Sequence, residues 1–250
     1  QQFKQMVMIS GFDKYFQIAP CFRDEDGRAD RSPGEHYQLD IEMSFVEQED
    51  IFKTLEPIFF NLFTEFGEGK IVSKTPFKKI SYKNSMLKYG TDKPDLRNPI
   101  EIFDVTEIMK RSDVKLDIFK KLIAKGAIVR AIPAPKTSSK PRSFFDDYNN
   151  WAKNEGGKGL GYILFEKKNN KLIGKGPLGK FFSEDAIKKL VNDGNLKEND
   201  AVFFSCDTKQ EVEKISGIAR QKLGKDLNLI DLNRFEFCWI IDYPMYQYDE

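Results

Sequence analysis

The sequence predicts an α+β protein, and three observations lead to that fold class. Two strand-like segments, Tyr15–Glu25 and His36–Val46, flank the polar stretch 26–35, which is the pattern of an antiparallel β-hairpin with a long loop. From about residue 100, strand-like and helix-like segments alternate. The run Phe235–Ile241 then returns to the aromatic, strand-rich character of the first part. The simplest organisation is a discontinuous core that is interrupted by an inserted α+β domain.

The first part of the chain contains one further helix and one further strand. Apolar residues recur at helical spacing from Ile51 to Phe66, with Pro57 as an expected kink. A short strand is expected near Phe77–Tyr82 and a helical turn at Ser85–Tyr89. The polar segment Gly90–Pro99 separates these elements from the alternating region.

The alternating region is expected to contain four strands and four helices. Ser183 should cap one of these helices, because a serine hydroxyl can accept a hydrogen bond from a free amide in the first turn. The expected strands are Glu101–Ile108, Ala127–Ala134, Gly159–Lys167 and Ala201–Cys206, and the expected helices are Asp117–Ala124, Arg142–Asn154, Ser183–Asn192 and Gln210–Leu223.

Composition excludes several classes of protein. The 250 residues carry 40 Lys and Arg against 39 Asp and Glu, so the chain does not coat nucleic acid by bulk charge. Three widely spaced cysteines and one histidine argue against a structural zinc site and fit a reducing cytosol. No apolar run reaches the ~20 residues of a membrane span. The chain begins at Gln1 and ends just after a strand-like run, so we expect a fragment of a longer protein.

The glycine-rich stretch GGKGLG, residues 156–161, does not predict a phosphate-binding loop. It lacks the GK[ST] ending, and a helix precedes it while a strand follows it, which is the reverse of a dinucleotide-binding turn. We interpret it as the turn that ends a helix.

The hairpin has one apolar and one polar face. Because strand side chains alternate, Gln38, Asp40, Glu42 and Ser44 share a face, while Tyr37, Leu39, Ile41, Met43 and Phe45 share the other, which is expected to belong to the core. On the first strand, Gln17, Arg23 and Glu25 point to one side. A solvated outer face could also be polar, but in a chain with 31 Lys and nine Arg such a face should carry lysine. This face carries an arginine, amides, a hydroxyl and carboxylates, which are typical of a shaped site.

These groups suggest an ATP-dependent reaction on an amino acid. A guanidinium such as that of Arg23 suits a phosphate or a carboxylate. Glu25 can accept from an exocyclic amine, Asp40 can take an ammonium group, and the ring of His36 can stack on a base. Arg28 and Arg31 lie in the loop, where they could reach nucleic acid.

The segment CFRDEDGRADRSPGEHYQLDIEMSF, residues 21–45, closely resembles motif 2 of class II aminoacyl-tRNA synthetases, in the form found in bacterial aspartyl-tRNA synthetases. The resemblance extends upstream to Gln1, and YGTDKPDLRNP (Tyr89–Pro99) and FCWIIDYPMY (Phe237–Tyr246) are similar to two further stretches of that family. It implies a partial antiparallel class II core at residues 1–97, a GAD-like insertion domain at 98–231, and a return to the core at 232–250 that stops before motif 3.

The resemblance also implies roles for individual residues. Arg23 would be the catalytic residue, binding the ATP α-phosphate and the substrate carboxylate. Asp24, Glu25 and His36 would complete the ATP site. Gln1, Lys4, Gln38 and Asp40 would bind aspartate together with Arg23, with Lys4 reading its side-chain carboxylate. Arg28 and Arg31 would approach the acceptor end of the tRNA.

His36 is a departure from the family pattern, which usually has phenylalanine there. Histidine can stack but can also take a proton near neutral pH, so the hypothesis is a weaker or pH-sensitive ATP site. Identical ATP affinities of the full-length protein at pH 6 and pH 8 would contradict it. The loop is also one residue longer than in some relatives, so the alignment within residues 32–36 is less secure than at Arg23 or Asp40.

The implied activity is that of an aspartate–tRNA ligase. It would use ATP and Mg²⁺ to make aspartyl-adenylate and transfer the aspartyl group to tRNA(Asp), and whether tRNA(Asn) is also charged is left open. The parent is expected to be a cytoplasmic homodimer with no membrane association, and no metal ligands are expected within these residues. Without motifs 1 and 3, the 250-residue chain alone is expected to be inactive.

Three other functions stay open at this point. One is a related class II ligase for asparagine or lysine, against which the insertion domain and the QQFK segment argue. Another is a GAD-containing tRNA-binding or amidotransferase subunit, against which Arg23, Glu25 and Asp40 together argue, because a pure binding module needs no ATP site. The last is an inactive paralogue.

Overall fold

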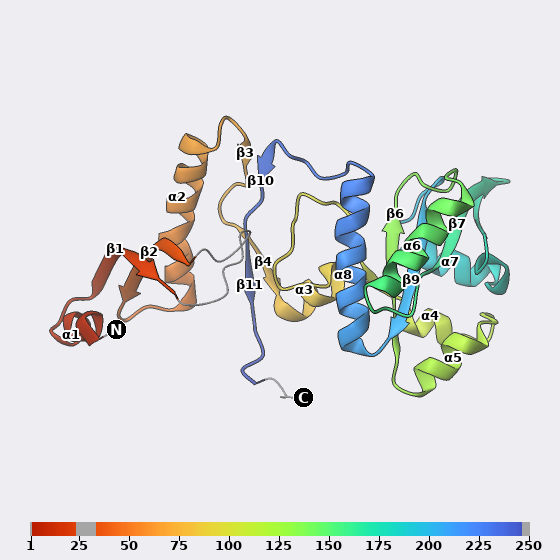
Figure 1. The fold of residues 1–250 in the computed structure, drawn as a ribbon, viewed down its shortest axis with the longest axis horizontal. Coiled ribbons are helices and arrows are strands. Elements are labelled where there is room, and N and C mark those ends of the chain that lie inside the picture. The colour runs from red at the N-terminus through yellow and green to blue at the C-terminus, as the bar shows by residue number, and fades with distance from the viewer. Residues whose placement is uncertain (1, 24–33, 247–250) are drawn as a thin grey trace. The chain divides into compact units, whose positions relative to one another are not determined.

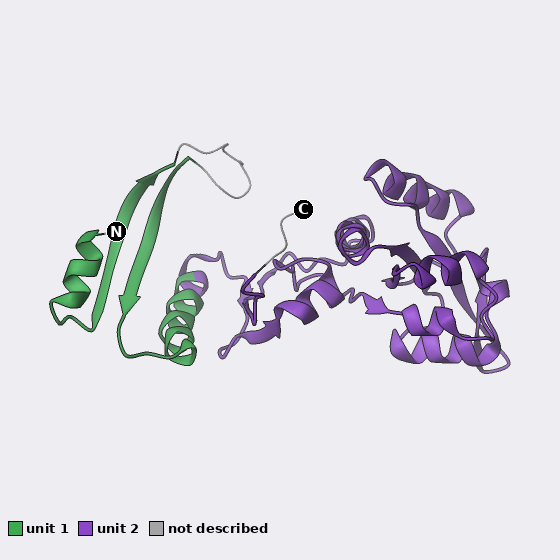
Figure 2. Cartoon of the chain, turned by 90° about the horizontal axis from the view of Figure 1, so that it is seen from below, with its two compact units in different colours: residues 1–62 green, residues 63–250 purple. Residues whose placement is uncertain are grey.

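The computed structural model describes residues 2–23 and 34–246, and the chain divides into two compact units, residues 1–62 and 63–250 (Figure 2). The α+β fold class is confirmed. The boundaries of the expected inserted domain, 98 and 231, stay predictions.

Unit 1 is built on the hairpin. Strand β1 (Lys14–Phe22) pairs antiparallel with β2 (Glu35–Met43), from Lys14 opposite Met43 to Phe22 opposite Glu35. Helix α1 (Gln2–Ile9), which the sequence analysis did not predict, precedes the hairpin. Helix α2 (Gln48–Phe66) follows it and continues through Pro57.

Within the described part of unit 1, the apolar face of the hairpin is largely exposed. Phe16 is 70% exposed and Tyr37 is 77% exposed, so the expectation that this face lies in a core is wrong for the described residues of unit 1. The physical reason is that α1 and α2 have few buried residues and supply no second apolar layer over it.

Unit 2 begins with two short parallel strand pairs. Strand β3 (Ile71–Val72) pairs with β10 (Arg234–Phe235), and β4 (Lys78–Ser81) pairs with β11 (Cys238–Ile241) (Figure 1). These pairings place the segments before and after the long middle region side by side. Helix α3 (Tyr82–Tyr89) follows β4, is capped by the Ser81 hydroxyl, and ends at Gly90 in the left-handed region.

The middle region is an antiparallel sheet with helices on both faces. The strand order is β5-β6-β9-β7-β8, made of β5 (Phe103–Asp104), β6 (Ile128–Ala134), β7 (Gly161–Lys168), β8 (Lys171–Lys175) and β9 (Ala201–Asp207). Helices α6 (Arg142–Asn154) and α8 (Lys209–Asp226) pack on one face. Helices α4 (Thr106–Lys110), α5 (Asp117–Ala124) and α7 (Glu184–Asp193) pack on the other.

Strand alternation explains the two cores. On β9, Val202 and Phe204 pack into the core under α4, α5 and α7, whereas Phe203 packs into the core under α6 and α8. All three side chains are almost fully buried. A strand that is covered on both faces should be continuously apolar, as β9 is. The 3-10 turn η1 (Gly179–Phe181) links β8 to α7. The expected cap of α7 is confirmed, because the Ser183 hydroxyl accepts a hydrogen bond from the Ala186 amide.

One expected strand is mostly wrong. Only Phe103–Asp104 of the segment Glu101–Ile108 is a strand, and α4 starts at Thr106. The Asp104 carboxylate accepts a hydrogen bond from the Thr106 amide at 2.7 Å, which turns the chain from strand to helix. None of the described helices has the length and apolar character that crossing a membrane requires.

Candidate functional site

The polar face of the hairpin is the candidate site. In the observed register Gln17 lies opposite Asp40, and Cys21 lies opposite His36, so side chains of alternate residues on the two strands share this face. Gln17, Gln38, Asp40 and Glu42 are therefore on one side, as the alternation predicts. By the same alternation Arg23, directly after β1, continues this row.

Helix α1 brings Lys4 onto this face. Its Nζ lies 3.1 Å from Asp40 Oδ1 and 2.7 Å from Glu42 Oε1. Gln17 Nε2 donates to Asp40 Oδ2 at 3.0 Å, so Asp40 is held by groups from α1 and β1. The Lys4 and Asp40 side chains are only 19% and 12% exposed. Lys4 Nζ also lies 3.2 Å from Asp40 Oδ2, so its three ammonium protons face three carboxylate oxygens.

The contacts in this cluster favour the charged forms of Lys4 and Asp40. The hydrogen bond from Gln17 and then that from Lys4 lower the pKa of Asp40. The hydrogen bonds to Glu42 and then to Asp40 raise the pKa of Lys4. Glu42 is a partner of Lys4 that the sequence analysis did not assign to the site, although its position two residues after Asp40 on the same face was the available signal.

Arg23 and His36 lie at the far end of the row. The Arg23 amide donates to the Gly34 carbonyl at 2.8 Å, which closes the hairpin, and its side chain is exposed. His36 Nδ1 is buried, and no group in residues 2–23 or 34–246 hydrogen-bonds to it. Arg23 is six residues from Gln17, or about 20 Å along the strand. The face thus offers a carboxylate-lined ammonium at one end and a guanidinium beside an imidazole at the other.

Five of the expected site residues lie outside the described residues: Gln1, Asp24, Glu25, Arg28 and Arg31. Their roles stay predictions, as does the role of Gln38, which contacts the Cys21 thiol at 3.7 Å. Among residues 2–23 and 34–246, no three His, Cys, Asp or Glu side chains are placed to hold a metal ion.

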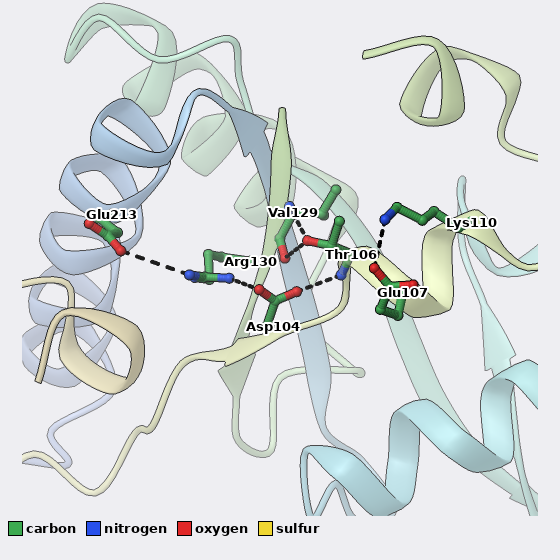
Figure 3. Close-up of polar contacts among 7 residues, drawn as sticks. All are labelled: Asp104, Thr106, Glu107, Lys110, Val129, Arg130 and Glu213. Atoms are coloured by element: carbon green, nitrogen blue, oxygen red, sulfur yellow. Dashed lines mark hydrogen bonds and ion pairs between the residues drawn. The ribbon is translucent and has the colours of Figure 1, made fainter. Parts of the chain in front are cut away.

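A second polar network lies in unit 2 and was not predicted (Figure 3). Arg130 on β6 is almost fully buried, forms an ion pair with Asp104, and has its Nη2 3.8 Å from Glu213 Oε1 on α8. Burial raises the pKa of Glu213. Asp104 also accepts from the Thr106 amide, and the Thr106 hydroxyl accepts from the Val129 amide at 2.9 Å. This network joins β5, β6 and α8, so its role is to hold the sheet and helix together.

The chain matches one known protein family over nearly its whole length. The sequence model of the tRNA synthetases class II (D, K and N) matches residues 1–248. The chain belongs to this class II family. The segment 21–45, which resembles motif 2, lies within this match, and the match covers nearly the whole chain.

Curated relatives are similar to this class II synthetase chain along its entire length. An "Aspartate--tRNA(Asp/Asn) ligase" from Beijerinckia indica is 54% identical over 250 residues, covering 100% of this chain and 42% of the relative. Proteins of the same name from Pelagibacter ubique and Rickettsia felis are 54% and 56% identical, with 42% and 41% of their lengths covered. The chain thus spans about two fifths of the length of these relatives.

Proposed function

We propose that the full-length protein is an aspartate–tRNA ligase that charges both tRNA(Asp) and tRNA(Asn). The observation that carries this is the Lys4–Asp40–Glu42 cluster on the polar face of a hairpin that also bears Arg23. The relatives named above are all more than half identical to the chain, and their name, aspartate--tRNA(Asp/Asn) ligase, supports the choice of aspartate and of the two tRNAs.

In the proposed first step, an oxygen of the aspartate α-carboxylate attacks the α-phosphorus of ATP. The bond from that phosphorus to the bridging oxygen breaks, and pyrophosphate leaves. Arg23 neutralises the charge that builds on the phosphate, and Glu25 and His36 hold the adenine. Asp24 belongs to the same ATP site. A fixed cation at the point where charge develops lowers the barrier without a protein nucleophile.

In the second step, a ribose hydroxyl at the 3′ end of the tRNA attacks the carbonyl carbon, and AMP leaves. Arg28 and Arg31 guide the acceptor end. Gln1, Gln38 and Asp40 hold the aspartate ammonium and backbone, and the Lys4 ammonium reads the side-chain carboxylate by giving up one of its two contacts to Asp40. Asp40 and Glu42 orient Lys4 for this task.

The remaining parts of the proposal concern the metal ion, the domain organisation and the full-length protein. Mg²⁺, which neutralises phosphate charge when bound with ATP, is proposed to be held by segments beyond residues 1–250. A class II core at 1–97 and 232–250, a GAD-like domain at 98–231, a homodimeric parent and a cytoplasmic location belong to the same proposal. The isolated 250-residue chain is expected to be inactive in pyrophosphate exchange.

Pyrophosphate exchange by the full-length protein tests the choice of amino acid. Exchange should depend on aspartate, and neither asparagine nor lysine should replace it. Aminoacylation of purified tRNA(Asp) and tRNA(Asn) then tests the second step. Exchange with asparagine or lysine instead would favour the related ligases, and no exchange with any amino acid would favour a binding subunit or an inactive paralogue.

The variant Lys4→Met tests the site. It removes a charge-assisted hydrogen bond to the substrate, so the KM for aspartate should rise roughly 10- to 150-fold while the KM for ATP stays unchanged. Lys14→Met is the matched control, because Lys14 begins β1 with its side chain on the face opposite to Gln17 and is exposed. If both variants raised the KM for aspartate equally, Lys4 would not be the residue that binds the side-chain carboxylate.

A further inference from the structure

The tip of the β7–β8 hairpin concentrates positive charge. Lys167 and Lys168 end β7, Lys171 begins β8, and Asn169 and Asn170 form the turn with positive φ angles of 50° and 61°. We call Lys167, Lys168 and Lys171 the basic tip. All three are exposed.

The pairing at this tip is unfavourable for the hairpin itself. Lys168 lies directly opposite Lys171 in the antiparallel register, and like charges in that position destabilise a hairpin. Lys167, the neighbour of Lys168, points to the other face of the sheet. The tip therefore presents cations to both sides, at a cost in hairpin stability that local folding does not explain.

Acidic partners neutralise this charge only weakly. Lys171 Nζ lies 3.6 Å from Glu184 Oε2, but the side chains are 77% and 84% exposed, and such a surface pair contributes little. Within residues 2–23 and 34–246, no ion pair forms to Lys167 or Lys168. Glu166, the nearest carboxylate along the strand, is paired with Lys175.

A cavity of about 740 Å³ lies beside the tip. Leu172, Ile173 and Val191 contribute its apolar lining, and Lys168, Lys171 and Lys188 contribute cations. Asn169, Glu184 and Asp185 complete it. Such a surface combines ammonium groups for anions with apolar groups for the faces of a sugar or base.

The charge of the whole middle region has the same sign. Residues 98–231 contain 25 Lys and Arg against 19 Asp and Glu, a net charge of +6, whereas the rest of the chain has 15 against 20. The near-neutral total therefore hides a region with a positive field, which attracts a polyanion from a distance.

We propose that the basic tip binds the phosphodiester backbone of the tRNA substrate. This inference rests on the proposed function, which supplies the RNA. Lysine ammonium and asparagine amide groups are the side chains that commonly contact phosphates, and the stretch KKNNK supplies both with no carboxylate. The contact is to the backbone, so it adds affinity without reading a base.

The test measures the affinity of full-length protein for a labelled tRNA(Asp) transcript between 50 and 300 mM KCl by fluorescence anisotropy. The triple variant Lys167→Gln, Lys168→Gln, Lys171→Gln should weaken binding about tenfold at moderate salt. It should also make the negative slope of log affinity against log salt shallower by roughly two to three. This is about 0.7–0.9 for each phosphate that is no longer neutralised. Pyrophosphate exchange, which needs no tRNA, should stay unchanged.

The matched control removes the same charge from another part of the same region. Three other exposed lysines lie on or beside α5, namely Lys115, Lys121 and Lys125. Changing all three to Gln should leave the affinity within about twofold of the unsubstituted value, and the salt slope within about 0.5 of it. An equal loss in both triple variants would show bulk attraction and overturn the proposal. An unchanged salt slope in the tip variant would also overturn it.

A competition experiment addresses an acidic protein as the partner instead. If a polyglutamate peptide displaces the tRNA from the unsubstituted protein but no longer from the tip variant at equal charge concentration, the tip recognises carboxylates and the proposal fails. If exchange is absent in the unsubstituted protein, the proposed function fails, whereas intact exchange with an unchanged salt slope refutes only the role of the tip.

Discussion

The guanidinium carbon of Arg220 lies 4.8 Å from the centre of the Tyr89 ring. The Arg220 side chain is completely buried, and it donates to the backbone carbonyls of Ile100, Asp95 and Asn98 at 2.6, 2.9 and 2.7 Å. Asn98 in turn donates to the Arg220 carbonyl at 3.0 Å. One side chain of α8 therefore fixes the segment 95–100, which directly precedes the five-stranded sheet.

Arg220→Met should release this segment. The substitution keeps an apolar chain of similar length but leaves three carbonyls without their charged donor, at a local cost of about 3–5 kcal/mol. Amide hydrogen exchange at Asn98, Ile100 and Ile102 should accelerate by roughly 100-fold or more, since each 1.4 kcal/mol is a factor of ten.

Arg142→Met is the control for this variant, because the Arg142 side chain is 82% exposed on α6. Its exchange pattern should match that of the unsubstituted protein. Unchanged exchange at Ile100 in Arg220→Met would mean that the backbone of this segment is held by other contacts.

Gly217 and Gly90 form a close backbone contact between α8 and the end of α3. A Cβ at Gly217 would lie 2.7 Å from the Gly90 carbonyl oxygen, closer than atoms can approach. Gly217→Ala normally gains about 1 kcal/mol in a helix, but here the clash should reverse the sign and destabilise by about 1–3 kcal/mol.

The midpoint of thermal unfolding of unit 2 should fall in Gly217→Ala and stay constant in Lys214→Ala, which changes an exposed residue one turn earlier. A raised midpoint in Gly217→Ala would show that α8 can move away from α3 without loss.

The two kinds of periodicity in the sequence explain which parts of the fold could be predicted. Alternation on β2 predicted the shared face of Gln38, Asp40 and Glu42, because a strand with a period of two leaves no other choice. Helix α7 was predicted from the Ser183 cap and the acidic residues Glu184 and Asp185 in the first turn. Strand β8 was not predicted, because Lys171–Lys175 is the polar edge of a hairpin whose turn has no glycine.

The contacts that join distant segments could not be predicted in this way. Arg220 reads as one more charged residue on α8, and its burial follows only from the packing of 95–100 on that helix. Likewise, Lys4 has no local signal, and its place beside Asp40 depends on how α1 folds back on the hairpin. The resemblance to motif 2 supplied what periodicity could not.

The three cysteines should differ in reactivity. Burial raises the pKa of the Cys206 thiol to about 11, and burial also raises the pKa of Cys238. The thiolate is the nucleophile, so iodoacetamide at pH 8 should modify Cys21, which is partly exposed on the polar face, well before Cys206. Mass spectrometry of timed samples measures the order, and in guanidinium chloride all three should react at similar rates. Equal rates in the folded protein would contradict the burial of Cys206.

Asp40 and Lys4 should keep aspartate binding independent of pH near neutrality. Asp40 has a lowered pKa, so its ion pair is present above the usual value of 3.8 and is lost only as pH falls through the lowered one. Lys4 has a raised pKa, so the pair is fully present below 10.5 and is lost only as pH rises beyond it. The KM for aspartate in pyrophosphate exchange should therefore show no inflection from this pair between about pH 5 and 9.

The variants Asp40→Ala and Asp40→Asn separate charge from geometry in this cluster. Asparagine keeps an acceptor for Gln17 or Lys4, whereas alanine keeps none, so the KM for aspartate should rise more in Asp40→Ala. Glu35→Gln is the control, since Glu35 is exposed on the opposite face of the same strand. Equal KM values in the two Asp40 variants would mean that only the charge of Asp40 matters. A KM unchanged in both would separate Asp40 from the aspartate site and leave Glu42 as the carboxylate that positions Lys4.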